Sequence, residues 1–221
     1  MRHGPVIHRY LDPGDALGEV MFGIIMTLTF TVGARFFLGE EPFDRTELII
    51  GAVGCNIAWG IIDGVLLVVS SLFFRSQRAR LYRTLRTTPD DGKALAAVAD
   101  HFGLEDELAF PAEARGKLYE AIIAAGRRTD PAPVRVTRSD LMTAFLAFAL
   151  VTCASIPCLF PLLIIDDELL ALRACNAVQV VLLFIGGYRW GGYTDVTPWK
   201  VGLSIAILGI GMSILAVFLG G

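Results

Sequence analysis

Apolar residues along the chain gather into five long stretches that contain almost no charged side chains, and polar residues gather between them. Uncharged apolar stretches of about 18 or more residues are typical of helices that cross a lipid bilayer. The five stretches cover residues 17–34, 48–74, 141–165, 169–188 and 199–221. We therefore expect an all-α fold, an integral membrane protein with five transmembrane helices.

The longest polar segment, residues 75–140, is too polar to span a membrane and too apolar to be a plain linker. Its first part, 75–86, contains good helix formers and no breaker, which predicts that the second span continues as a helix. After a turn at Pro89-Asp-Asp-Gly, apolar residues recur at helical spacing within 91–102 and 112–125. Examples are Leu95, Val98, Leu118, Ile122 and Ile123. We expect a small cytoplasmic helical insert between spans two and three, with domain boundaries at 1–74, 75–140 and 141–221.

The basic residues indicate how the chain is oriented. If the N-terminus is cytoplasmic, the inner segments hold all of the 19 Lys and Arg residues except Arg35, Arg45 and Arg173. Such an excess on one side is the positive-inside pattern. We therefore expect the N-terminus in the cytoplasm, the C-terminus outside, and a prokaryotic plasma membrane as the location.

Composition excludes several classes of protein. With 54% hydrophobic and 19% charged residues, the chain has the make-up of neither a soluble enzyme nor a disordered protein. A net charge of −3 provides no basic field for nucleic acid. The sequence has no nucleophile elbow, phosphate-binding loop or dinucleotide fingerprint, and its four cysteines form no C-x-x-C pair. We expect neither an enzyme nor a bound cofactor.

Asp63 is the one ionisable residue within the second apolar stretch. A charged side chain at the bilayer centre costs about 2.5–3.5 kcal/mol, so a partner, water or a cation must offset that cost. Gly60 and Gly64 flank it in a Gly-x-x-x-Gly pattern that lets another backbone approach, and Asn56 lies on the same helical stripe. These features favour a cation site that uses Asp63 and Asn56. The alternative is an interhelical hydrogen bond from protonated Asp63.

Glu19 stands near the start of the first stretch, and Met26 follows on the same helix face. A carboxylate with a thioether can coordinate a borderline metal such as Fe²⁺ or Mn²⁺. Helix capping by Glu19 and plain packing of Met26 are the alternatives. In the insert, carboxylates can collect divalent cations, or they can be solvated faces that balance the arginines. The candidates for metal collection are Glu105, Glu107, Glu113 and Glu120.

Polar and helix-breaking residues also occur in the later stretches. Pro157 and Pro161 lie inside the third, which predicts either a plain kink or freed carbonyl groups beside a polar cavity. Asn176 and Gln179 lie one turn apart in the fourth, where they can pair with Asp63 or with the acids outside.

Three segments of the chain carry a family resemblance. Arg75-Ser-Gln-Arg78, followed by Leu81-Tyr82, leaves the second stretch. Ala144-Phe-Leu-Ala-Phe148 leads to Ile156-Pro-Cys-Leu-Phe-Pro161 in the third, and small residues recur through 202–220 in the last. With the order of two spans, a cytoplasmic helical insert and three more spans, these segments resemble the vacuolar iron transporter family.

This resemblance implies a homodimeric exporter of Fe²⁺, and often of Mn²⁺, that is driven by counterflow of protons. Glu19 resembles the family's acid near the start of the first span, and Asp63 is an acid in the second. The resemblance also implies that glutamates of the insert collect metal. The family's Ser-Met and Gly-Glu-Tyr motifs are absent from the second stretch.

Two functional hypotheses follow. The first is a proton-coupled divalent metal transporter that exports Fe²⁺ or Mn²⁺ from the cytoplasm, in which Glu19 and Asp63 alternate between holding protons and holding metal. The second is a non-transporting membrane scaffold or regulatory subunit of the same fold, with residues 75–140 as its docking module. The absent second-span motifs favour the second hypothesis.

Overall fold

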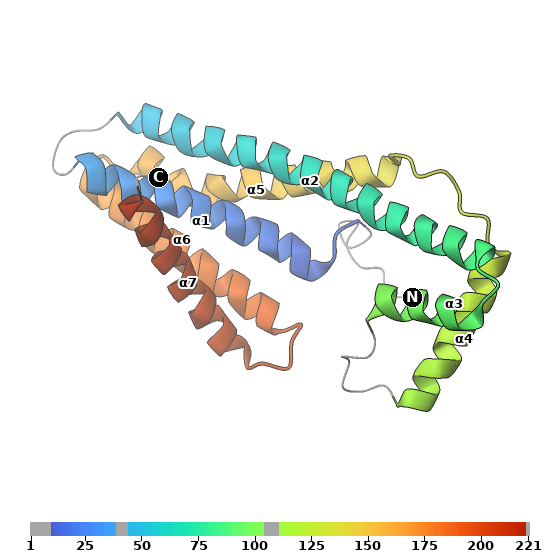
Figure 1. The fold of residues 1–221 in the computed structure, drawn as a ribbon. Helices are drawn as coiled ribbons and strands as arrows, with labels where there is room; N and C mark the ends of the chain where they lie inside the picture. The colour runs from blue at the N-terminus through green and yellow to red at the C-terminus, as the bar shows by residue number, and fades with distance from the viewer. Residues whose placement is uncertain (1–9, 39–43, 104–110, 220–221) are drawn as a thin grey trace, which may run out of the picture. The chain divides into compact units, whose positions relative to one another are not determined.

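The computed structural model describes residues 10–38, 44–103 and 111–219. Within these residues the chain forms seven α-helices and no β-strand, which confirms the all-α prediction (Figure 1). In chain order the helices are α1 (Pro13–Leu38), α2 (Arg45–Thr87), α3 (Asp91–Phe102), α4 (Ala112–Arg128), α5 (Arg138–Ile164), α6 (Glu168–Gly191) and α7 (Pro198–Phe218).

Five of the helices in the described residues are long and apolar enough to cross a membrane. They are α1, α2, α5, α6 and α7, and each contains one of the five apolar stretches of the sequence apart from one to three residues at the ends of the third and fifth stretches. α2 has 43 residues because the helix continues from its apolar part through the arginine-rich residues, as the helix formers there predict. α5 runs through both Pro157 and Pro161 as one helix.

The chain divides into two compact units. The first comprises Met1–Leu67 with Arg138–Gly221, and the second comprises Val68–Thr137. The first unit therefore contains most of the apolar helices, and the second contains α3, α4 and the last part of α2. α2 contributes to both units.

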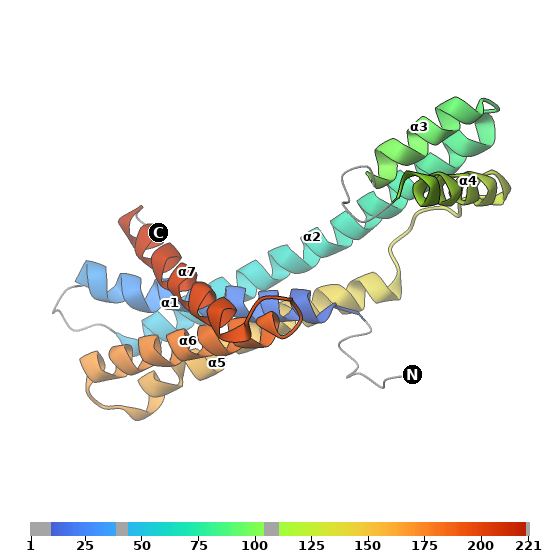
Figure 2. The same ribbon diagram turned by 90° about the horizontal axis from the view of Figure 1, so that it is seen from below.

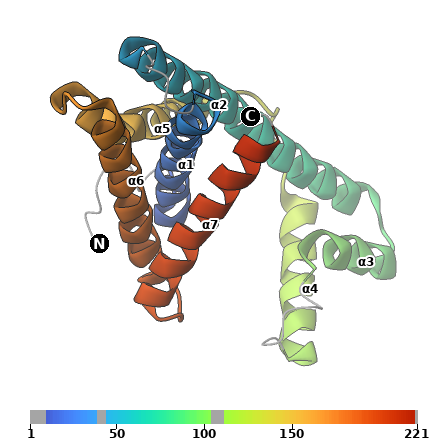
Figure 3. The same ribbon diagram turned by 90° about the vertical axis from the view of Figure 1, so that its left-hand side faces the viewer.

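In the first unit, α1 occupies the middle of the helix bundle. α6 and α7 lie side by side and form a hairpin (Figure 2). Along the bundle, α2, α5, α6 and α7 surround α1, which packs directly against α5, α6 and α7 (Figure 3). One apolar core cluster consists of Met21, Ile24, Leu28, Ala154, Cys158 and Leu183. Because α1 is central, a polar residue on α1 can meet side chains from several neighbouring helices.

The second unit has a small apolar core of its own. Three helices contribute Leu81, Leu85, Ala94, Val98, Tyr119 and Ile123. Of the apolar residues at helical spacing, Val98 and Ile123 are buried, whereas Leu95 and Leu118 are 41% and 37% exposed. The difference arises because in a three-helix unit each helix buries only the face that meets the other two.

Local signals fix where α3 begins and ends. The carboxylate of Asp90 accepts hydrogen bonds from the backbone N–H groups of Gly92 (2.8 Å) and Lys93 (3.2 Å), as an N-cap residue does. At the other end Gly103 has φ of +60°, the left-handed conformation that glycine adopts at helix C-termini. The predicted turn at Pro89-Asp-Asp-Gly is therefore the start of this helix.

Candidate functional site

Glu19 of α1 and Asp63 of α2, the two acids that the sequence singles out, line the same pocket. The pocket is open, has a volume of about 420 Å³ and lies within the first unit. Its other lining residues are Gly14, Asp15, Gly18, Phe22, Leu67 and Trp190. The structure thus brings together two carboxylates that are 44 positions apart in the chain.

A third carboxylate, that of Asp15, lines the pocket as well, and the sequence analysis missed it. Asp15 precedes Glu19 by four residues, so the helical spacing was the signal that could have found it. None of the described residues that line the pocket is basic. We call this set of Asp15, Glu19 and Asp63 the acidic vestibule, because an opening lined by one sign of charge attracts ions of the other sign.

The acidic vestibule is not a finished metal chelate. Among the described residues, no group of three or more His, Cys, Asp or Glu side chains is arranged so that it could hold a metal ion. Glu19 and Asp63 are half-buried, and Asp15 is exposed. The carboxylates therefore share one open space without converging on one point.

Gly60 and Gly64, which flank Asp63, are in contact with α5. A Cβ atom added to Gly60 would lie 3.1 Å from the Cα atom of Phe148, and one added to Gly64 would lie 3.0 Å from the carbonyl oxygen of Ala144. The Gly-x-x-x-Gly pattern therefore serves the close backbone approach that it predicts. α5 occupies the notch, and Asp63 lines the vestibule with α1.

Asn56 ties three helices together at a fully buried position. Its Nδ2 group has two hydrogens to share among three acceptors, the carbonyl oxygens of Gly23 (3.1 Å) and Val151 (3.1 Å) and the hydroxyl oxygen of Thr27 (3.2 Å). These partners belong to α1 and α5, while Asn56 belongs to α2. The amide nitrogen of Asn56 is thus a structural link, and only its oxygen is available to a ligand.

Thr31 extends this hydrogen-bond network to α6. Its hydroxyl lies 2.7 Å from Asn176 Oδ1 and 3.1 Å from Gln179 Oε1, and the backbone carbonyl oxygens of Leu28 (3.1 Å) and Thr27 (3.3 Å) compete with them for its one hydrogen. Asn176 and Gln179 therefore both meet α1 at Thr31, and neither lines the pocket that holds Asp63. We call the five residues of this network the polar core: Thr27, Thr31, Asn56, Asn176 and Gln179.

The polar core contains two buried atoms without a hydrogen-bond partner among the described residues, Asn56 Oδ1 and Gln179 Nε2. Both side chains are fully buried. An unpaired buried amide costs about 1–3 kcal/mol in proteins, and the interior of a bilayer offers no water to reduce that cost. Such unpaired groups are suited to a water molecule or an ion that binds between the helices.

Met26 lies on α1 and is half-buried, but it is not among the residues that line the acidic vestibule. It follows Glu19 by seven residues, which corresponds to about 10 Å of helix. The structure therefore places the thioether closer to the C-terminal end of α1 than Asp15 and Glu19.

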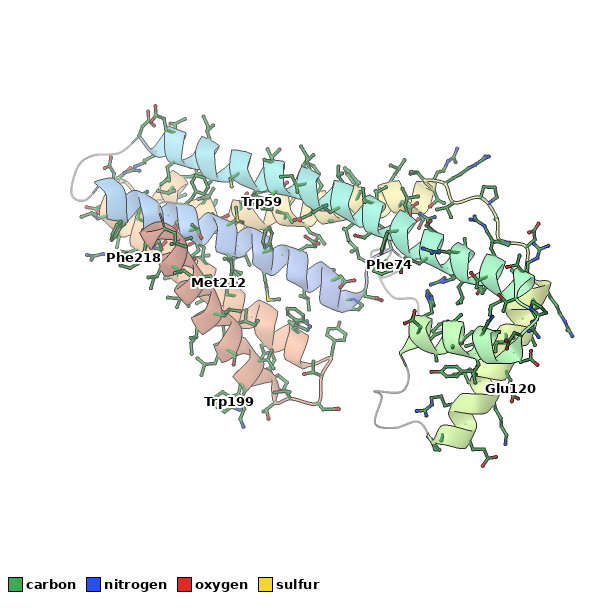
Figure 4. The ribbon with its side chains drawn as sticks, in the orientation of Figure 1. Trp59, Phe74, Glu120, Trp199, Met212 and Phe218 are labelled. Atoms are coloured by element: carbon green, nitrogen blue, oxygen red, sulfur yellow. The ribbon has the colours of Figure 1, made fainter. Side chains whose placement is uncertain are left out.

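The two candidate acids of the insert that the structure describes, Glu113 and Glu120, do not line a common pocket. Glu113 forms an exposed ion pair with Lys117 (2.6 Å). Glu120 lies on α4 (Figure 4) and lines a pocket of about 410 Å³ in the second unit with Asp91 and Arg127, where Arg127 binds Asp91 at 2.8 Å. The two candidates that lie outside the described residues are Glu105 and Glu107.

No protein-family model matches the chain, and no curated protein matches it. What the protein does therefore has to follow from the chemistry of the acidic vestibule and the polar core.

Proposed function

We propose that this chain is an integral membrane protein that exchanges divalent metal ions for protons and exports Fe²⁺ or Mn²⁺ from the cytoplasm. The observation that carries the proposal is the acidic vestibule. Glu19 and Asp63, each half-buried in a candidate membrane span, line one open pocket with Asp15, and no described lining residue is basic. Carboxylates at such positions are costly, and they mark ion and proton pathways in membrane proteins.

Charge balance explains how two acids couple the metal to protons. Two protonated carboxyl groups are neutral, and two carboxylates with one divalent cation are neutral as well. When a divalent cation enters, Glu19 and Asp63 each release one proton, and when it leaves on the other side they each take one up. The pair of Glu19 and Asp63 is thus neutral both with two protons and with one divalent cation, which avoids an uncompensated charge inside the bilayer.

The polar core supports a route beyond the vestibule. From Glu19 to Thr31 is 12 residues of α1, or about 18 Å of helix, which is more than half of a hydrocarbon layer about 30 Å thick. Asn56 meets α1 between these two positions, and Gln179 meets it at Thr31. Polar groups therefore accompany α1 through much of the proposed membrane.

Topology and assembly belong to the same proposal. With the N-terminus in the cytoplasm, the vestibule faces the cytoplasm, α3 and α4 form a cytoplasmic insert, and the C-terminus lies outside. We further propose a homodimer and kinship with the vacuolar iron transporter family, in a prokaryotic plasma membrane. The apolar part of α2 is only 11% buried within one chain, the least of the five candidate spans, which leaves much of its surface for lipid or a second copy.

The proposal is tested by reconstituting the purified protein into liposomes that contain a pH indicator. Mn²⁺ added outside should raise the luminal pH as protons leave in exchange. Asp63→Asn and Glu19→Gln should each reduce this signal to that of protein-free liposomes, because an amide cannot release a proton. The matched control is Asp195→Asn, which removes one exposed carboxylate from the connection between α6 and α7. Asp195→Asn should give the same proton flux as the wild type. Undiminished proton flux in Asp63→Asn would refute the proposal.

A membrane scaffold or regulatory subunit of the same fold is the second candidate. It is favoured by the absence, among the described residues, of any three-ligand metal group. The liposome assay separates the two functions, because a scaffold gives no Mn²⁺-dependent proton flux even in its wild-type form. Wild-type flux that depends on Asp63 excludes the scaffold as the sole function.

A further inference from the structure

A second pocket, wholly within the second unit, is lined by arginine side chains. It has a volume of about 510 Å³ and lies between α2 and the segment 129–137 that follows α4. α2 contributes Arg75, Arg78 and Tyr82, and the segment contributes Arg135. We call it the arginine pocket.

The arginine pocket carries an excess of positive charge. Its only acid among the described lining residues is Asp130, and Arg86, which does not line the pocket, already forms an ion pair with it. Neither Arg78 nor Arg135 forms an ion pair with any residue that the structure describes. Two guanidinium groups, one on each wall, are therefore available to an anion.

The wall opposite α2 is held in place by its own sequence. Pro131 and Pro133 each fix their backbone φ angle near −65°, which stiffens the segment without a helix or strand. The ion pair between Arg86 and Asp130 links the start of the segment to α2. A pocket whose walls are set before binding loses less conformational entropy when a ligand arrives.

The position of the pocket along the chain matches the depth of lipid phosphates. The apolar part of α2 ends at Phe74, which is 61% exposed (Figure 4). Because α2 continues as one helix, Arg78 lies about 6 Å beyond Phe74, and the headgroup layer of a leaflet is about 5–8 Å thick. Arg135 lies three residues before α5, the next candidate span. Both walls are thus close in sequence to the proposed membrane surface.

We infer that the arginine pocket binds a phosphate-bearing anion through Arg78 and Arg135. Guanidinium groups bind phosphate through paired N–H···O hydrogen bonds, which a lysine cannot form. The headgroup of an acidic phospholipid and a free phosphate compound offer the same group, and the apolar lining residues Ala79, Ala132 and Val134 are suited to the glycerol part of a lipid. Binding of an anion at this pocket does not depend on the proposed transport. If the anion is a lipid headgroup, binding requires only that α2 crosses the bilayer.

The test is calorimetric titration of the full-length protein in a neutral detergent with two probes, phosphatidylglycerol in mixed micelles and inorganic phosphate in solution. The R78Q/R135Q variant should bind about thirtyfold more weakly than the wild type, since each arginine contributes about a factor of five toward an anionic lipid. The matched control is R83Q/R128Q, which removes the same charge from α2 and α4 at exposed positions outside the pocket. Its affinity should equal that of the wild type.

Binding of phosphatidylglycerol alone identifies a lipid headgroup site, and binding of inorganic phosphate that the R78Q/R135Q variant loses identifies a site for soluble phosphate compounds. The R78K/R135K variant keeps the charge and the fold, and it should bind more weakly than the wild type because it lacks the paired donors. The inference is overturned if neither probe binds the wild type, if both glutamine pairs weaken binding equally, or if R78K/R135K binds as the wild type does.

Discussion

At Gly23, α1 and α5 approach each other more closely than a side chain would allow. A Cβ atom added to Gly23 would lie 2.5 Å from the carbonyl oxygen of Val151 and 3.0 Å from the Cβ atom of Ala154. The carbonyl belongs to the backbone of α5, so it cannot rotate away as the end of a side chain can. Gly23→Ala should therefore push the two helices apart by about half an ångström.

The cost of this displacement can be estimated from three contributions. Overpacking of a closely packed contact costs about 1–3 kcal/mol, and the higher helix propensity of alanine returns up to about 1 kcal/mol. The same movement lengthens the 3.1 Å hydrogen bonds from Asn56 to Gly23 and Val151, and such bonds between membrane helices are worth about 0.6 kcal/mol each. We expect Gly23→Ala to lower the free energy of unfolding by about 1–3 kcal/mol.

Gly18→Ala is the matched control, because a Cβ atom at Gly18 of the same helix meets nothing within 4 Å. It should leave stability unchanged or raise it by up to about 1 kcal/mol. The measurement is reversible unfolding of the purified protein in mixed micelles as the fraction of SDS increases. If Gly23→Ala proves as stable as Gly18→Ala, the close contact between α1 and α5 is not present in the native protein.

Three further predictions concern the unpaired polar groups and the exchange of protons. Gln179→Leu removes a buried amide whose nitrogen has no hydrogen-bond partner among the described residues. The free energy of unfolding in the SDS assay should therefore be unchanged or higher by about 1 kcal/mol, and the Mn²⁺-dependent proton flux should fall. Tyr119→Phe removes a buried hydroxyl that has no partner among the residues the structure describes, and thermal unfolding followed by circular dichroism should show no loss of stability. Lowering the pH on the side where Mn²⁺ is added should slow uptake, because protons compete with the metal for Glu19 and Asp63. Mn²⁺ uptake that does not depend on pH would contradict the exchange of metal for protons.

Most of the fold can be predicted from the sequence because a bilayer and a helix impose simple lengths. An apolar stretch of about 20 residues is long enough to cross, and α1, α2, α5, α6 and α7 all contain one. The helices of the insert follow from the cap at Asp90 and from apolar spacing. The sequence could not show that α1 is central, because periodicity reports which face of a helix is apolar and not which helix covers it.

The candidate site could be predicted only in part, for the same reason. The cost of burying charge was enough to single out Glu19 and Asp63, and the structure places them at one pocket. Gln179 was expected to pair with Asp63 or with acids outside, but it bonds to Thr31, because the partner depends on how the helices are arranged around α1. The role of Thr31 as a partner of α6 could not be recognised from the sequence, since threonine in a membrane helix commonly bonds to its own backbone.

The geometry of the two buried amides distinguishes what each could do on a pathway. Asn56 cannot turn its amide over, because its nitrogen is surrounded by two carbonyl oxygens and a hydroxyl, and its free oxygen is therefore fixed as an acceptor. Within the described part of the chain, the side chain of Gln179 has one hydrogen-bond partner, the hydroxyl of Thr31, which can donate or accept, so Gln179 can present either its nitrogen or its oxygen to the other side. The fixed oxygen of Asn56 is suited to binding a cation. The amide of Gln179, which can point either way, is suited to binding water molecules that carry protons. A scaffold has no use for the unmet nitrogen of Gln179, since an apolar residue at that position would cost it little, whereas Asn56 also serves a scaffold because its nitrogen links α2 to α1 and α5.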